Sequence, residues 1–240
     1  MDSPDPSLVE ALHHADQRLV RTVDSLDGDR WQEPSRLPDW TRAHVVAHLA
    51  LNAEAFASAL EAIDRGAEQP IYPSQAARDS DIAELAREDS AEIRDRLFAA
   101  TTRFRDAVAG LTGSQWASTV ERLPGGPVWP SADLVAARIR EVEVHHADLD
   151  AGYGPADWPI AFATALLDLC ATNHAATGRT DPFAAYASDL GRTWPVGADA
   201  PVVSGTAAAL GWWLIGRGDG RDLASDGPDG TLPRIGSWQR

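Results

Sequence analysis

Hydrophobic residues recur every three to four positions over most of the first 150 residues, which is the spacing that lines one face of an α-helix. Clusters of Gly, Pro, Asp and Ser interrupt this pattern and mark the ends of the helices. Ser7 and Glu10 form a capping box at the first helix, and Ser131 is placed to cap the last. The pattern predicts four helices, over about 7–26, 39–66, 80–110 and 131–150, the third with an irregularity near Asp89.

The pattern changes after residue 152, where a further helix is expected over about 158–176. Two short hydrophobic runs on either side of Asp189-Leu190-Gly191 predict a β-hairpin, and a strand over 201–205 leads into a helix over 206–218. We therefore expect an α+β protein, with a four-helix bundle over 1–152 and a small α/β domain over 153–240.

Three residues of the expected bundle have the side chains of a metal site. His48 lies in the second predicted helix, and Glu141 and His145 lie four residues apart in the fourth, so these two share one face of that helix. Two imidazoles and one carboxylate are a standard ligand set for catalytic zinc and leave the fourth position open for water, a thiol or a substrate. The sequence thus predicts a metal centre for Zn²⁺ or another divalent ion.

Other interpretations fit the same stretches. A histidine in a mixed helix is more often packed or solvated than a ligand, and Glu–His pairs at this spacing are frequent on helix surfaces. In the fourth helix, Glu143 and His146 form a competing pair at i,i+3. His44, one turn before His48, could support the site without binding the ion.

Composition limits the partners that we expect. The formal net charge of −15 argues against nucleic acid, because phosphates attract clustered Lys and Arg. No apolar run approaches the length of a membrane span, and the first residues lack the features of a signal peptide, so we expect a cytoplasmic protein. Cys170 is the single cysteine and is expected in a helix core, so any thiol that the reaction needs must come from outside.

Five stretches of the sequence are similar to one family of enzymes. They are WTRAHVVAHLALNAEAF, EQPIYPSQAARDSDIAE, REVEVHHADL, the VVSG strand and the closing GRG, and the similarity extends over nearly the whole chain. By these stretches the chain resembles the mycothiol-dependent maleylpyruvate isomerases of actinobacteria. The resemblance implies a DinB-like N-terminal bundle and a small α/β C-terminal domain, and it places the family's zinc ligands on His48, Glu141 and His145.

The resemblance also implies an activity, the zinc- and mycothiol-dependent conversion of maleylpyruvate to fumarylpyruvate in gentisate breakdown. Reversible addition of a thiolate turns a cis double bond into a single bond that can rotate, and a metal ion makes the thiol nucleophilic at neutral pH. The family's functionally important arginine falls on Arg217, which would grip a substrate carboxylate through two parallel hydrogen bonds. The residues alone favour a helix C-terminal cation there.

Asn52 and two further functions complete the expectations. Asn52, one turn after His48, would bind the thiol or orient a ligand, unless it is a plain helix-surface residue. The alternative activities are an S-transferase that joins mycothiol or another small thiol to electrophiles, and a non-enzymatic metal-binding stress protein, against which the resemblance around Arg217 counts. As partners we expect a small dicarboxylate substrate and a low-molecular-weight thiol, without nucleic acid or membrane, and we expect a monomer.

Overall fold

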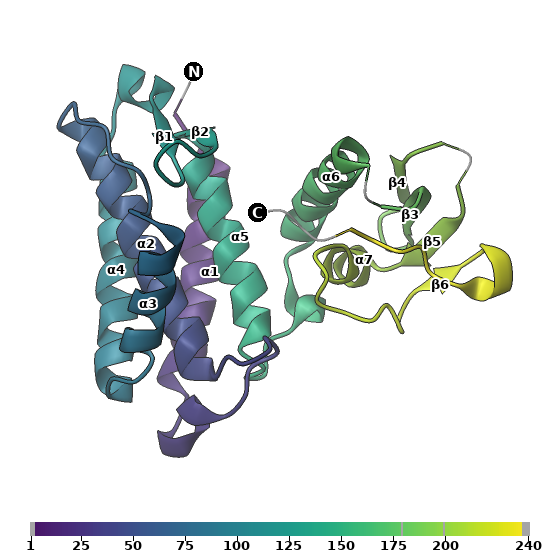
Figure 1. Ribbon diagram of the computed structural model, residues 1–240, viewed down its shortest axis with the longest axis horizontal. Helices are drawn as coiled ribbons and strands as arrows, with labels where there is room; N and C mark the ends of the chain where they lie inside the picture. Colours follow the sequence, from purple (N-terminus) through teal and green to yellow (C-terminus); the bar gives the residue numbers. More distant parts are fainter. Residues whose placement is uncertain (1–2, 179, 199, 237–240) are drawn as a thin grey trace. The chain divides into compact units, whose positions relative to one another are not determined.

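The structure is a computed structural model that describes residues 3–178, 180–198 and 200–236. The chain divides into two compact units, residues 1–153 and 154–240. Both contain helices together with small sheets, so the protein has the α+β class that the sequence predicts (Figure 1). Within the described residues, no helix is both long and apolar enough to cross a bilayer.

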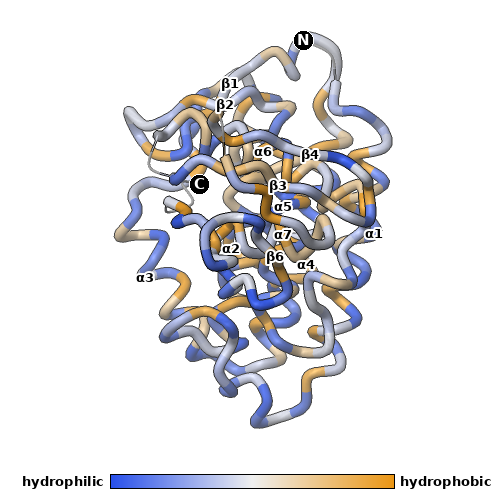
Figure 2. The backbone as a smooth tube through the Cα atoms, turned by 90° about the vertical axis from the view of Figure 1, so that its right-hand side faces the viewer, coloured by the Kyte–Doolittle hydropathy of each residue, from blue (hydrophilic) through white to orange (hydrophobic). Residues whose placement is uncertain are grey.

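Four long helices pack side by side as a bundle in the first unit (Figure 1). In Figure 2, hydrophobic and hydrophilic residues alternate along the helices, as expected where each helix turns one side to a core. That core includes Leu19, Leu49, Leu97 and Val142, one from each helix and none of them exposed. The bundle helices are α1 (Pro6–Asp24), α2 (Arg42–Asp64), α4 (Ser90–Gly110) and α5 (Asp133–Asp148).

Two of the predicted helix caps are wrong. The cap of α1 is Asp5, whose Oδ1 accepts a hydrogen bond from the backbone N–H of Ser7 at 2.8 Å, so the helix begins two residues earlier than a Ser7 cap allows. Ser131 does not cap α5, because its hydroxyl donates instead to the carbonyl oxygen of Trp116 at 3.1 Å.

The predicted helix over 80–110 is two helices, α3 (Gln75–Leu85) and α4. Asp89 causes the break, because its side chain accepts from the N–H of Ala91 and starts α4. The cap of α2 is Thr41, and His44 completes it by accepting from the backbone N–H of Thr41 at 3.3 Å. His44 therefore serves the start of this helix.

A short hairpin lies between α4 and α5. Its strands are antiparallel, and the backbone N–H of Tyr72 donates to the carbonyl of Arg122 just after the first strand, at 3.0 Å. This pairing fixes the loop before α3 against the bundle. The elements are β1 (Thr119–Glu121) and β2 (Val128–Pro130), with single 3₁₀ turns η1 (Gly28–Gln32) and η2 (Gly113–Ala117).

The second unit packs two helices with a four-stranded sheet of order β4-β3-β5-β6. The predicted hairpin is confirmed as the antiparallel pair β3–β4, and β5 runs parallel to β3. The sequence did not predict β6, which is only two residues long. The elements are η3 (Pro155–Asp157), α6 (Ile160–Thr177), β3 (Phe183–Ala187), β4 (Arg192–Val196), β5 (Val202–Gly205), α7 (Ala207–Leu214), β6 (Ala224–Ser225) and η4 (Pro228–Gly230).

Helix α7 ends earlier than predicted, in a Schellman motif. Gly216 has a φ of +74°, a conformation that glycine adopts without strain, and its N–H donates to the carbonyl of Trp213 at 2.8 Å. The next N–H, that of Arg217, donates to the carbonyl of Trp212 at 3.1 Å. Arg217 thus lies beyond the last turn of the helix.

Candidate metal centre

The bundle brings together the three residues that the sequence singles out. One ligand atom from each of His48, Glu141 and His145 lies within 4.8 Å of the others. The Nε2 atoms of His48 and His145 lie 2.9 and 3.3 Å from the same carboxylate oxygen, Oε2 of Glu141. Both histidines are buried, whereas 19% of the Glu141 side chain is exposed, so Glu141 is the most exposed member of the cluster.

Burial and hydrogen bonding set the protonation states of the cluster. Burial lowers the pKa of His48 to about 3, so its ring is neutral near pH 7. Burial alone would raise the pKa of Glu141, but hydrogen bonds from His145 and His48 hold that pKa well below its usual value, and the carboxylate is ionised. A neutral imidazole and an ionised carboxylate are the forms that bind a divalent metal.

His145 has a carboxylate behind its ring. Oδ2 of Asp148, a residue with no exposed surface, lies 2.9 Å from Nδ1 of His145, although the contact is not aligned as a hydrogen bond. A carboxylate beside Nδ1 can hold a proton there when an ion takes Nε2, which faces Glu141 in the metal-free cluster. Metal-binding histidines commonly have this kind of partner, so His145 fits a metal ligand.

His48 has the opposite kind of neighbour. Nη2 of Arg78, from α3, lies 3.1 Å from Nδ1 of His48, and a guanidinium can only donate. Nδ1 therefore accepts and the proton lies on Nε2, from which it is donated to Glu141. Binding of a metal ion at Nε2 requires that this proton move to Nδ1 and that Arg78 turn away. The three donor atoms fit a divalent ion on that condition.

Asn52 is buried, so the helix-surface interpretation is wrong. It is 2% exposed, and both ends of its amide have partners within the bundle. Oδ1 accepts from Nη1 of Arg138 at 2.7 Å, and Nδ2 donates to the hydroxyl of Tyr72 at 3.0 Å. Tyr72 also lies beneath the guanidinium of Arg78, 5.5 Å from the ring centroid. Asn52 thus connects the ligand helix α2 to the loop before α3.

The competing pair, Glu143 and His146, is engaged elsewhere. Glu143 accepts from Nη2 of Arg18 at 2.5 Å and from the hydroxyl of Tyr153. His146 contacts the hydroxyl of Thr22 at 2.8 Å, and its ring stacks on that of Tyr153 with centroids 3.8 Å apart. Within the described residues, the carboxylate and imidazole groups that converge as a metal site are those of His48, Glu141 and His145.

The second unit contains the two remaining candidate residues. Cys170 lies in α6 with no exposed surface, in the helix core that the sequence predicts. Arg217 follows the Schellman turn after α7, so it is not a cation within the last turn of that helix.

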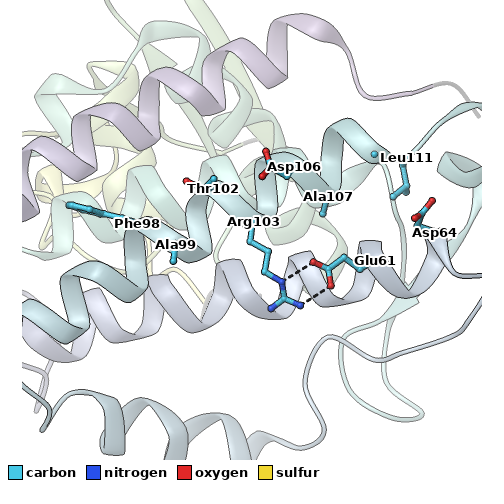
Figure 3. Close-up of a pocket in the computed structure, with 10 residues that line it drawn as sticks. Glu61, Asp64, Phe98, Ala99, Thr102, Arg103, Asp106, Ala107 and Leu111 are labelled. Atoms are coloured by element: carbon cyan, nitrogen blue, oxygen red, sulfur yellow. Dashed lines mark hydrogen bonds and ion pairs between the residues drawn. The ribbon is translucent and has the colours of Figure 1, made fainter.

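A separate groove of about 790 Å³ lies between α2 and α4 (Figure 3). Across it, Arg103 of α4 makes a two-pronged ion pair with Glu61 of α2, at 2.7 and 2.8 Å. Glu61 is thirteen residues after His48, roughly 20 Å along the helix at its ordinary rise. The groove therefore takes no part in the metal centre.

Sequence reasoning missed four residues around the centre, namely Tyr72, Arg78, Arg138 and Asp148. Tyr72 and Arg78 lie in the stretch EQPIYPSQAARDSDIAE, whose only signal in the sequence is its similarity to the family. Arg138 and Asp148 lie three residues before Glu141 and three after His145, a helical spacing that could have drawn attention to them.

Comparison with known proteins assigns the chain to a family. The profile of the mycothiol maleylpyruvate isomerase N-terminal domain matches residues 12–150, more than half of the chain. A search of curated proteins gives no match. Two crystal structures, of the mycothiol-dependent maleylpyruvate isomerase and of a histidine-to-alanine mutant of it, are similar to 99% of this chain and 100% of theirs, with a TM-score of 0.89 and 24% identity. The two folds are thus alike over their whole length, and the chain belongs to the mycothiol maleylpyruvate isomerase N-terminal domain family.

Proposed function

We propose that this protein is a metal- and mycothiol-dependent isomerase that converts maleylpyruvate to fumarylpyruvate in gentisate breakdown. The observation that carries the proposal is the convergence of His48, Glu141 and His145 within 4.8 Å in a chain of this family. Zn²⁺ held by these residues would lower the pKa of a coordinated thiol, whose reversible addition makes the substrate double bond rotatable.

The side chains around the centre have separate roles in this proposal. Asp148 would hold the proton of His145 at Nδ1 once the ion occupies Nε2. Arg78, which lies beside the His48 ring, would supply positive charge near the centre that can stabilise negative charge developing on the substrate. Arg217 binds a substrate carboxylate, for which its planar guanidinium is suited.

The thiol comes from outside the protein, because Cys170 is buried in α6. Asn52 contributes to thiol binding indirectly, since its amide is used to hold the hydroxyl of Tyr72. We place the reaction in the cytoplasm, with a small dicarboxylate and a low-molecular-weight thiol as the partners of a monomer.

The experiment that tests the proposal follows maleylpyruvate in the presence of purified protein, Zn²⁺, and either mycothiol or glutathione. We expect fumarylpyruvate to form with mycothiol, and the activity to disappear with a chelator and return with Zn²⁺. No turnover of maleylpyruvate by metal-loaded protein with either thiol would contradict the isomerase. Metal-dependent consumption of mycothiol with a general electrophile, without isomerisation, would instead identify an S-transferase.

A further inference from the structure

A buried arginine joins the two helices that carry the candidate ligands. Arg138 lies in α5 and has no exposed surface. Its Nη1 donates to the carbonyl oxygen of Leu49 at 2.9 Å and to Oδ1 of Asn52 at 2.7 Å, and both acceptors belong to α2. Because the guanidinium is planar and rigid, this clamp restricts how α2 can slide or turn against α5.

Both ends of the clamp lie close to a ligand along the chain. Arg138 is three residues before Glu141 and seven before His145, and residues at this spacing share one face of a helix. On α2, Leu49 directly follows His48. A shift of α2 along α5 would break the clamp and would also change the 2.9 Å separation between Nε2 of His48 and Oε2 of Glu141.

The clamp extends through Asn52 to the edge of the centre. The amide of Asn52 holds Arg138 with its oxygen and the hydroxyl of Tyr72 with its nitrogen. Burial and, second, the negative charge of Glu141 raise the pKa of Tyr72, so this phenol lies within electrostatic reach of a ligand. One arginine therefore supports both the spacing of the ligand helices and the position of Tyr72.

The burial of Arg138 destabilises the fold. Nε and Nη2 of Arg138, and Oδ1 of the nearby buried Asp16, have no hydrogen-bond partner among the residues that the structure describes. Unsatisfied buried donors destabilise a protein, and apolar residues in place of buried ions often leave stability unchanged or raise it. Arg138 is therefore better explained by a role in positioning α2 and α5 than by a contribution to stability.

We propose that Arg138 is a positioning residue of the metal centre. Its contacts with Leu49 and Asn52 hold α2 and α5 at the spacing at which the three ligands bind one divalent ion. This inference rests on the proposed metal site and adds a residue that does not touch the ion.

The test compares Zn²⁺ affinity, measured by competition with a chromophoric chelator, and the visible spectrum of the Co²⁺-loaded protein, which reports ligand number and geometry. Arg138→Met removes the clamp. The double variant Asp16→Asn with Arg138→Met also removes the carboxylate that would otherwise lose its counter-charge. Arg103→Met is the control, because Arg103 also joins α2, through Glu61, but far from the ligands (Figure 3).

We expect Zn²⁺ to bind about tenfold more weakly or worse in both clamp variants, the scale seen when supporting residues of metal sites are lost, with an altered Co²⁺ spectrum. The control should remain within about twofold of the wild type on the same scale. Thermal unfolding of the metal-free proteins checks that the clamp variants are folded. Asn52→Leu keeps the contact between Arg138 and Leu49 but loses the one between Arg138 and Asn52, so it should also weaken Zn²⁺ binding. This variant replaces Arg138→Met in the test if Arg138→Met does not fold.

Unchanged Zn²⁺ affinity and Co²⁺ spectrum in a folded Arg138→Met protein, or in Asn52→Leu where the former does not fold, would overturn the inference. A wild-type chain that binds neither ion would overturn the metal site and this inference together. Metal binding that depends on Arg138, without turnover of maleylpyruvate, would support the inference and overturn only the proposed reaction.

Discussion

Replacing Asp16 with asparagine should stabilise the protein at neutral pH, even though Asp16 lies near the cation of Arg138. Burial raises the pKa of Asp16 from 3.8 to about 6, and the opposing influence of Arg138 and then Arg105 does not cancel this. At pH 7 the folded protein therefore holds a carboxylate where the neutral acid is preferred. A gap of about two pKa units corresponds to roughly 3 kcal/mol, at about 1.4 kcal/mol for each unit.

The pH dependence gives the prediction its sign. Between about 3.8 and 6 the folded state binds a proton on Asp16 that the unfolded state has lost, so this group adds stability as the pH falls through that window. The penalty is complete above the folded pKa and absent below the unfolded one. Asp16→Asn removes it, so the variant's advantage should be roughly 3 kcal/mol at pH 7 and close to zero below about pH 4.

Urea unfolding of the metal-free proteins, followed by circular dichroism from pH 4 to 7, measures this difference. Subtracting the wild-type free energy cancels the groups that both proteins share, including His48 and His146, whose pKa values burial lowers to about 3. Asp106→Asn, on the exposed side of α4, is the control and should change little. A loss of stability in Asp16→Asn at pH 7 would refute the reasoning and show that electrostatic attraction to Arg138 outweighs burial. An advantage that persists at pH 4 would show that its origin is packing.

Four other predictions test the proposed site. His48→Ala should abolish both Zn²⁺ content and turnover while the bundle stays folded, whereas His146→Ala should keep its metal; equal metal loss in both, by elemental analysis, would move the ligand assignment. Arg78→Met should raise Zn²⁺ affinity roughly fivefold, because the hydrogen bond from Arg78 to Nδ1 of His48, worth about 1 kcal/mol, no longer has to break before Nε2 of that ring can bind the ion. Weaker Zn²⁺ binding by this variant in a chelator competition would argue against the assigned tautomer of His48. Cys170→Ser should turn over normally with added mycothiol, and activity without added thiol that this variant lacks would point to an internal nucleophile. Arg217→Ala should lower kcat/KM by the equivalent of about 3 kcal/mol of transition-state stabilisation, with little change in Tm. Arg217→Lys should recover little of the lost activity, because lysine lacks the planar fork of the guanidinium. Near-normal kcat/KM in both variants would assign the arginine a structural role.

Local patterns in the sequence were enough to predict most of the elements. Helical periodicity marks the bundle helices because each turns one face to a core, and Asp189-Leu190-Gly191 marks the hairpin because its residues favour a tight turn. Glu141 and His145 could be paired from the sequence because one helix carries both, and four residues make one turn. His48 was added to them as the third side chain of a standard zinc ligand set, and the family resemblance implied the same three residues, but nothing in the chain between them relates the two helices.

Tertiary structure decided what lies around those residues. His48 and Glu141 are 93 residues apart, and only the packing of α2 against α5 brings their atoms to 2.9 Å. The same packing turns Arg138 toward Leu49 and Asn52, and brings Arg78 from α3 to the ring of His48. Such contacts depend on how separate helices meet, and a pair of residues so distant in the chain has no shared periodicity. The sequence therefore determined which groups can do the chemistry, and the packing of the helices determined which of them meet.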